Sequence, residues 1–192
     1  MKFSRSDTLQ FRALVSVTVA AALMRLLPHP YNFTPIAGLA LFGGAHFRDL
    51  RLAFAVPLLA MFASDLVLAV VVYGGAAFRS MPLVYLAFAM TVALGRCLRS
   101  RRTSIGIGLA SVGAALLFYL ITNLGVWLQG NLYPMSAEGL VACYAAAIPY
   151  LRNDILGNLF YALVFFGGFA LVKQRSSALQ GDSASIVVEP SS

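Results

Sequence analysis

The sequence predicts an all-α integral membrane protein, a bundle of six transmembrane helices with both termini in the cytoplasm. The first supporting observation is composition: of 192 residues, 60% are hydrophobic and 11% are charged, and the mean hydropathy is +0.82. Soluble domains are typically about 45–50% apolar and about 25% charged. The second is that apolar segments recur along the chain, most of them close in length to the ~20 residues that a membrane-spanning helix needs. We expect one membrane domain over residues 1–173 and a disordered cytoplasmic tail, rich in Ser, over 174–192.

Five of the six spans are expected as continuous helices. In the first span, Arg12 and Arg25 lie near opposite ends, where both can extend to a headgroup layer. A further helix at 136–150 is expected on the membrane surface or packed into the bundle. The five continuous spans are residues 9–27, 52–73, 81–95, 105–127 and 155–172.

The second span is expected to be broken. Residues 28–35 include three prolines and cannot form a continuous helix. Helix can begin again with Thr34 as its N-cap and Pro35 in its first position, and it then runs over 36–47. That length is short for a full crossing, so we interpret this span as re-entrant or partly unwound. Such backbone is tolerated at membrane depth where protein or a cavity covers it.

Basic residues set the predicted orientation. With the N-terminus inside and six crossings, eleven of the 14 Lys and Arg residues fall in inner segments, which is the positive-inside bias of membrane proteins. The basic residues flank apolar runs and form no face or stripe, so the sequence argues against nucleic-acid binding. The three outer ones are Arg25, Arg79 and Arg152.

Asp65 is the residue that points most directly to a function. It is the only charged residue between Arg51 and Arg79, and a carboxylate at membrane depth costs ~3 kcal/mol on insertion scales. In the six-span arrangement Asp65 lies in the outer half of the membrane with polar groups from several other segments, which predicts an outward-facing binding pocket. These groups are Asn32, Thr34, Arg79, Ser80, Tyr85, Asn123, Arg152, Asn153 and Asp154.

Simpler interpretations of the same residues stay open. Asp65 can be the structural ion-pair partner of Arg152 or Arg79, and Asn123 can bond one helix to another, as is common in membranes. Ser16 and Ala20 lie four residues apart on one helix face. Small side chains at that spacing let another helix approach closely, either within the bundle or from a partner subunit.

The sequence predicts no enzyme, cofactor or metal site. It contains no nucleophile-elbow, metalloprotease or phosphate-loop motif. Its two histidines and two cysteines are not spaced as metal ligands.

Several short motifs occur in order along the chain, and Tyr85 lies among them. They are NFTPI at 32–36, ALFGG at 40–44, SDL at 64–66, TNLGVW at 122–127 and IPYLRN at 148–153. Together, over roughly residues 10–173, they resemble a bacterial family of small membrane proteins similar to the S components of energy-coupling factor (ECF) transporters. Within that group the chain is nearest to the BtuM-type vitamin B12 uptake proteins.

The resemblance implies an S-component-like bundle with a vitamin pocket at its outer face, in which Asp65, Tyr85 and Arg152 stand at pocket positions. It also places Ser80 at about the position of the cysteine by which BtuM-type proteins ligate cobalt. A hydroxyl is a far poorer cobalt ligand than a thiolate. A cobalamin would therefore be held here by shape and by hydrogen bonds.

Two function hypotheses follow. In the first, the chain is a multi-pass protein of the bacterial cytoplasmic membrane that binds a vitamin-like micronutrient as substrate for uptake. It acts alone or with an energy-coupling ATPase module docked at the first span, on the face of Ser16 and Ala20. In the second, it is a non-transport scaffold or regulator that binds partner proteins through that face.

Overall fold

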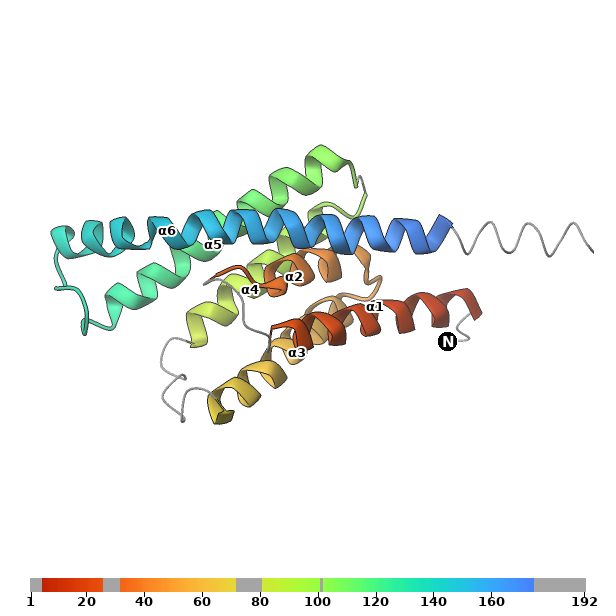
Figure 1. Ribbon diagram of the computed structural model, residues 1–192, viewed down its shortest axis with the longest axis horizontal. Helices are drawn as coiled ribbons and strands as arrows, with labels where there is room; N and C mark the ends of the chain where they lie inside the picture. Colours follow the sequence, from red (N-terminus) through yellow and green to blue (C-terminus); the bar gives the residue numbers. More distant parts are fainter. Residues whose placement is uncertain (1–4, 26–31, 72–80, 101, 175–192) are drawn as a thin grey trace, which may run out of the picture.

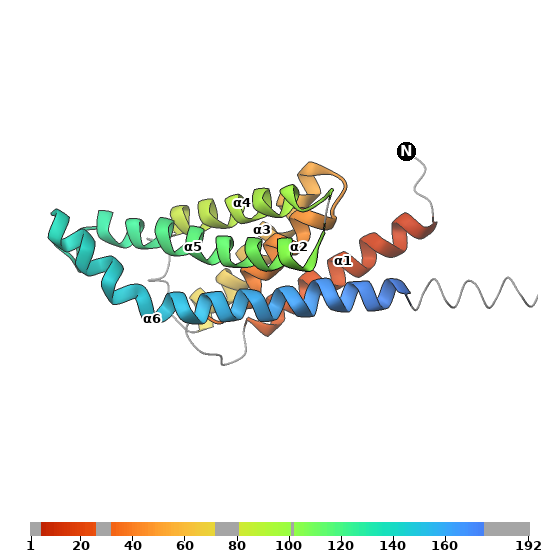
Figure 2. The same cartoon turned by 90° about the horizontal axis from the view of Figure 1, so that it is seen from above.

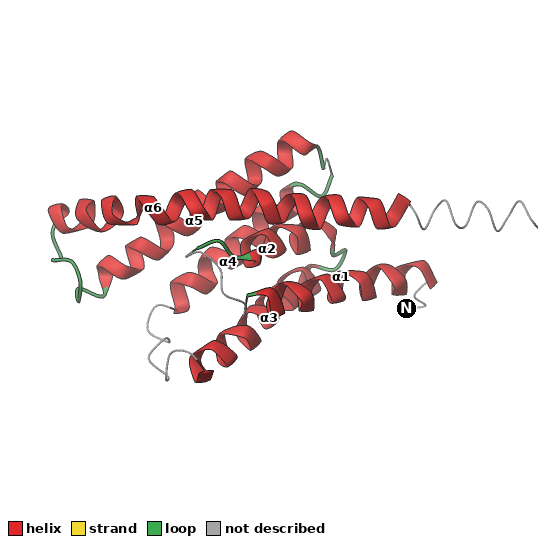
Figure 3. Ribbon diagram, viewed as in Figure 1, coloured by secondary structure: helices red, strands yellow, loops and turns green. Residues whose placement is uncertain are grey.

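The computed structural model describes residues 5–25, 32–71, 81–100 and 102–174. Every regular element in these ranges is helical (Figure 3), so the predicted all-α class is confirmed. The helices lie roughly lengthwise in one elongated bundle (Figures 1 and 2). They are α1 (Arg5–Met24), α2 (Pro35–His46), α3 (Leu50–Val71), α4 (Met81–Cys97), α5 (Ser104–Leu128) and α6 (Ala137–Ala162), and the π-helical segment η2 (Leu163–Gly167) continues α6.

Helix α2 is the buried centre of this bundle. All its residues from Pro35 to Ala45 are buried, and it contacts α1, α3, α4, α5 and α6. Its start follows the predicted signal: Thr34 is extended, and Pro35 occupies the first turn, where a missing N–H costs nothing. Because its 12 residues rise only about 18 Å, α2 is too short to cross a hydrocarbon core of ~30 Å alone.

Helices α2 and α4 touch backbone to backbone through a reciprocal pair of glycines. A Cβ atom on Gly44 would lie far inside contact distance of the Val92 carbonyl oxygen, and one on Gly95 would meet the Leu41 carbonyl oxygen in the same way. Close approach through small residues is the usual packing device of membrane helices, since dispersion contacts between them are then maximal.

The prediction of a helix at 136–150 and a separate span at 155–172 is wrong, because one helix, α6, covers both. It runs unbroken through Pro149, and helix continues to Gln174, which makes 38 residues in all. Figure 2 shows that its first half is inclined to its second half. That first half packs against α5, where Tyr119 Oη donates to the Tyr144 carbonyl and Tyr144 Oη donates to the Leu120 carbonyl, both at 2.6 Å. These contacts hold the turn of the helix that precedes the proline, and Pro is tolerated in such apolar helices.

The segment η2 carries α6 onto α2. A π-turn holds one residue more than an α-turn, and here the neighbouring residues Phe165 and Phe166 are both buried. Their ring centroids lie 6.0 and 5.3 Å from that of Phe42 on α2. This aromatic group fixes the second half of α6 against the central helix.

The surface of the bundle is apolar in a way that suits lipid. Ile105 on α5 is 78% exposed, and Leu59, Leu109 and Leu163 are also largely exposed. Three stretches of the described chain are long and apolar enough to cross a membrane, namely Leu50–Ala69, Ser104–Leu128 and Ala137–Gln174. The fold is all-helical, and these three stretches are compatible with a membrane protein.

Gly44→Ala is expected to destabilise the bundle, because the new methyl group would meet the main chain of α4. Overpacking of this kind costs about 1–3 kcal/mol, so the thermal unfolding midpoint in detergent should fall by several degrees. Gly113→Ala is the matched control, since its methyl would lie 3.5 Å from Leu94 Cδ2, an ordinary contact. Equal midpoints for the two variants would contradict the close packing of α2 on α4.

Candidate functional site

A buried ion pair ties together the end of α1, the last third of α3 and the start of α4. Asp65 on α3 is buried. Its Oδ1 pairs with Arg25, which directly follows α1, and its Oδ2 accepts a hydrogen bond from Tyr85 Oη at 2.9 Å. Arg25 also donates to Ser64 Oγ at 2.9 Å. Each carboxylate oxygen thus has a partner, and such partners offset part of the hydration that a buried charge loses.

Among the described residues the partner of Asp65 is Arg25, not the expected Arg152. Arg152 is exposed on α6, and Arg79 lies outside the described residues. Arg25 was expected to reach a headgroup layer, but its guanidinium turns inward to α3. The structure therefore brings Asp65 and Tyr85 together, as part of the predicted set, while Arg152 does not join them.

Two small cavities lie in this region, and Arg25 of the ion pair lines the smaller one. Their volumes are about 270 and 130 Å³, and because both are lined by Asn32, Phe118 and Asp154, they are neighbouring compartments of one region. We call them the Asp154 cavities. The larger is also lined by Tyr119, Thr122, Asn123, Ala147, Tyr150 and Leu151. The smaller is also lined by Arg25, Thr34, Ile36, Ala37, Val84 and Phe88.

Asp154 has the most unusual environment of these residues. It is only 6% exposed, and among the described residues its Oδ2 is the one buried side-chain oxygen or nitrogen without a hydrogen-bond partner. Buried polar atoms are nearly always paired, and an unpaired carboxylate oxygen is costly. An acceptor held unsatisfied in a cavity wall is ready to bind a donor that enters the cavity.

The other polar groups in the larger cavity are held in place by the α5 backbone. Asn123 Nδ2 donates to the Tyr119 carbonyl at 2.8 Å, and Thr122 Oγ1 donates to the Phe118 carbonyl at 2.7 Å. Asn32 has a positive φ of 61°, a conformation that Asn adopts more readily than most residues. The region thus combines amides, one unpaired carboxylate oxygen and aromatic rings.

The predicted pocket residues are divided by the structure. Asn32 and Asn123 line the Asp154 cavities, whereas Asp65, Tyr85 and Arg152 line neither of them. Arg25 stands between Asp65 and the smaller cavity, because it contacts the one and lines the other. Ser80 lies outside the described residues.

The predicted docking residues lie elsewhere. Ser16 and Ala20 are exposed on α1, so the described part of the bundle does not cover this face. On the opposite face of α1 Thr18 is buried, and its hydroxyl donates to the Leu14 carbonyl at 2.8 Å.

Sequence reasoning missed Arg25 as a site residue, and it gave Asp154 no role of its own among the predicted pocket groups. Arg25 was placed at a membrane interface because it ends an apolar run. Asp154 was placed in a polar break between helices because Arg152 and Asn153 precede it. An available signal was periodicity: Asp154, Asn158 and Tyr161 recur at helical spacing and are all buried.

Arg25→Gln is expected to destabilise the protein strongly, because it leaves Asp65 as an uncompensated buried charge. Breaking a buried pair in this way costs about 3–5 kcal/mol. The double variant Arg25→Gln/Asp65→Asn should recover much of the loss, since no charge is then left alone. Thermal midpoints of the two variants and of exposed Arg152→Gln, as control, measure this. A double variant no more stable than the single one would argue against a coupled pair.

Comparison with known proteins places the chain in a family but gives it no characterised relative. No curated protein and no solved structure shows significant similarity to it. Residues 5–179 match the family described as "Family of unknown function (DUF6580)", and this match covers nearly the whole chain. The protein therefore belongs to the DUF6580 family, whose function is unknown.

Proposed function

We propose that the protein is a multi-pass protein of the bacterial cytoplasmic membrane that binds a small nitrogenous micronutrient for uptake, in the manner of an S component. The observation that carries the proposal is the unpaired Oδ2 of Asp154 in the wall of both cavities. In the proposed topology the chain crosses six times, both termini are cytoplasmic, α2 forms part of the second crossing, and the Asp154 cavities lie toward the outer face.

The charges around the cavities indicate the chemistry of the solute. The guanidinium of Arg25 is matched by Asp65, so the carboxyl group of Asp154 is left to attract a solute. A positively charged or N–H-rich group satisfies it best, because charge-assisted hydrogen bonds are the strong ones. Phe118 and Tyr119 add aromatic rings, which favour organic cations.

The volumes indicate the size of the solute. Pockets for drug-sized ligands measure about 300–1,000 Å³, whereas the two compartments measure about 270 and 130 Å³. They suit a small solute better than a corrinoid, so within the vitamin class we favour a small cationic or amine-containing compound over cobalamin.

Uptake needs a source of energy as well as a binding site. The exposed face of α1 at Ser16 and Ala20 is the proposed contact for an energy-coupling ATPase module. The same exposed face supports the second candidate function, a scaffold or regulator without a transported solute. The two functions differ in their need for Asp154, because a scaffold would not depend on this carboxyl group.

Asp154→Asn is the test of the binding site. A hydrogen bond to a charged group contributes about 1.5–3 kcal/mol, so the affinity for the solute should fall roughly 10–100-fold. The thermal midpoint of the free protein should stay or rise, because a neutral amide replaces a buried carboxyl group that can carry a charge. A role in folding alone would lower the midpoint instead.

The measurement is mass spectrometry of small molecules released from the purified protein, compared at equal amounts of folded wild type, Asp154→Asn and exposed Glu138→Gln as control. We expect a nitrogenous compound from the wild type and the control that is depleted in Asp154→Asn. Identical profiles from all three proteins would reject the binding site and leave the scaffold function.

The proposed topology is tested separately with reporter fusions. A phosphatase that is active only outside the cytoplasm should be active when fused after Gly130, in the connection between α5 and α6, and inactive when fused after Lys173. A green fluorescent reporter, which folds only inside, should give the opposite pattern. Activity of the phosphatase after Lys173 would contradict the six-span arrangement.

A further inference from the structure

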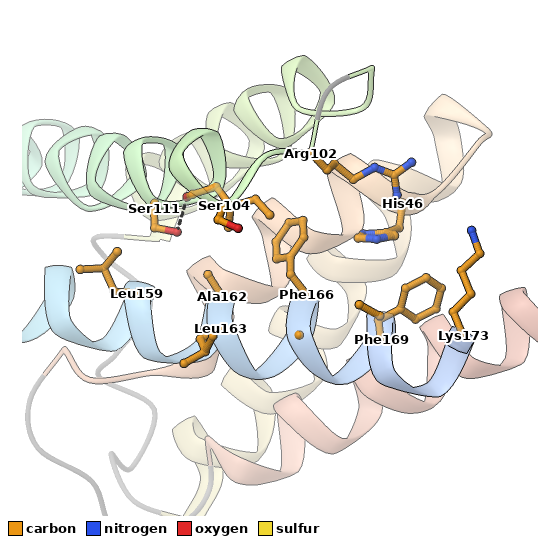
Figure 4. Close-up of a pocket in the computed structure, with 14 residues that line it drawn as sticks. His46, Arg102, Ser104, Ser111, Leu159, Ala162, Leu163, Phe166, Phe169 and Lys173 are labelled. Atoms are coloured by element: carbon orange, nitrogen blue, oxygen red, sulfur yellow. Dashed lines mark hydrogen bonds between the residues drawn. The ribbon is translucent and has the colours of Figure 1, made fainter. Parts of the chain in front are cut away.

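A cavity of about 580 Å³ lies at the opposite end of α5 and α6 from the Asp154 cavities. Its walls are the end of α2, the first three turns of α5 and the last part of α6 with η2 (Figure 4). We call it the Arg102 cavity. It is larger than either Asp154 cavity, and neither the predicted pocket residues nor the proposed function involves it.

Basic groups gather at one end of the Arg102 cavity. Figure 4 shows Arg102 and Lys173 near the ring of His46, while Ser111 and Leu159 lie toward the other end. Of the 14 described residues that line it, none is acidic. The cavity therefore presents positive charge at one end only.

The ring of His46 is a fixed part of that end. Its Nδ1 donates to the Phe42 carbonyl at 3.0 Å. Its centroid lies 5.2 Å from that of Phe166 and 4.8 Å from that of Phe169. The floor below the basic groups is thus made of packed rings that are apolar and rigid.

Apart from Ser104 and Ser111, the side chains that line the rest of the cavity are apolar, and the cavity is continuous with the exposed apolar surface. Leu163 lines it and is 72% exposed, and Leu109, one residue after the lining residue Gly108, is 70% exposed. A Cβ atom built on Gly108 would meet nothing within 4 Å. The groove between α5 and α6 is therefore open sideways to whatever surrounds the bundle.

We propose that the Arg102 cavity binds one anionic phospholipid of the surrounding bilayer. The phosphate lies at the basic end against Arg102 and Lys173, and one acyl chain runs along the apolar groove past Leu163. Basic pockets between membrane helices on the cytoplasmic side are suited to anionic headgroups. The N-terminus of α5, which begins at Ser104 in the same wall, adds a favourable dipole.

The shape of the charge distribution favours a lipid over a free anion. A soluble phosphate would use only the basic end and leave the apolar groove unfilled. A neutral lipid would fill the groove and gain little from the two basic side chains. Each basic residue near an anionic headgroup contributes about fivefold in affinity, so an anionic phospholipid uses both halves of the site.

The test compares lipids on the purified full-length protein. Phosphatidylglycerol, phosphatidylcholine and free glycerol phosphate are added in turn to protein in detergent, and bound lipid is counted by native mass spectrometry while the thermal midpoint is recorded. We expect phosphatidylglycerol to bind at a ratio of one and to raise the midpoint most. Equal effects of the two lipids, or an equal effect of glycerol phosphate, would overturn the proposal.

Two matched pairs of variants locate the site. Gly108→Leu should fill the groove without a clash and abolish the retained lipid, whereas Gly168→Leu also extends into open space but does not line the cavity and should keep it. Arg102→Gln should weaken phosphatidylglycerol about fivefold, whereas Arg51→Gln, exposed at the same end of the bundle, should not. If both members of a pair behave alike, the lipid is not bound in the Arg102 cavity.

Discussion

The packing of α2 governs the rest of this structure. A short helix that is apolar on every face has no surface to show to water, and it is too short to serve as a membrane span alone. Other helices must therefore surround it. The glycines at the α4 contact and the aromatic rings of η2 are the means by which two of them come close enough. The Asp154 cavities and the Arg102 cavity then lie where this cover is incomplete, at the two ends of α2.

Local signals were sufficient to predict α2, and they were insufficient for α6. The bounds of α2 follow from Thr34 and Pro35, which act through the backbone within one turn. Helix α6 continues past Pro149, and α5 holds the turn before this proline through hydrogen bonds of Tyr119 and Tyr144. A contact between residues 25 apart leaves no trace in a local pattern, so the polar run at 152–154 was interpreted as an interruption.

The candidate site shows the same limit in electrostatic terms. That Asp65 needs a partner could be predicted from its isolation in an apolar segment, but which arginine supplies the charge depends on how α1 ends beside α3. Asp154 shows the reverse relation between sequence and fold. In sequence it has charged and polar neighbours, and in the fold it loses them, because on a helix Arg152 points to the exterior while Asp154 faces the core. Exposure and neighbourhood are set by helical phase, so adjacent residues can have unrelated environments.

The π-helical segment has a consequence for how this family can change. A π-turn corresponds to the insertion of one residue into an α-helix, and each residue turns an α-helix by about 100°. After η2 the side chains therefore point in directions rotated from those of an uninterrupted α-helix. This rotation brings Phe169 and Lys173 to His46. Loss or gain of a single residue within 163–167 would re-aim that end of the helix and leave Asp154 where it is. The two ends of one long helix are thus free to diverge independently through a length change at η2.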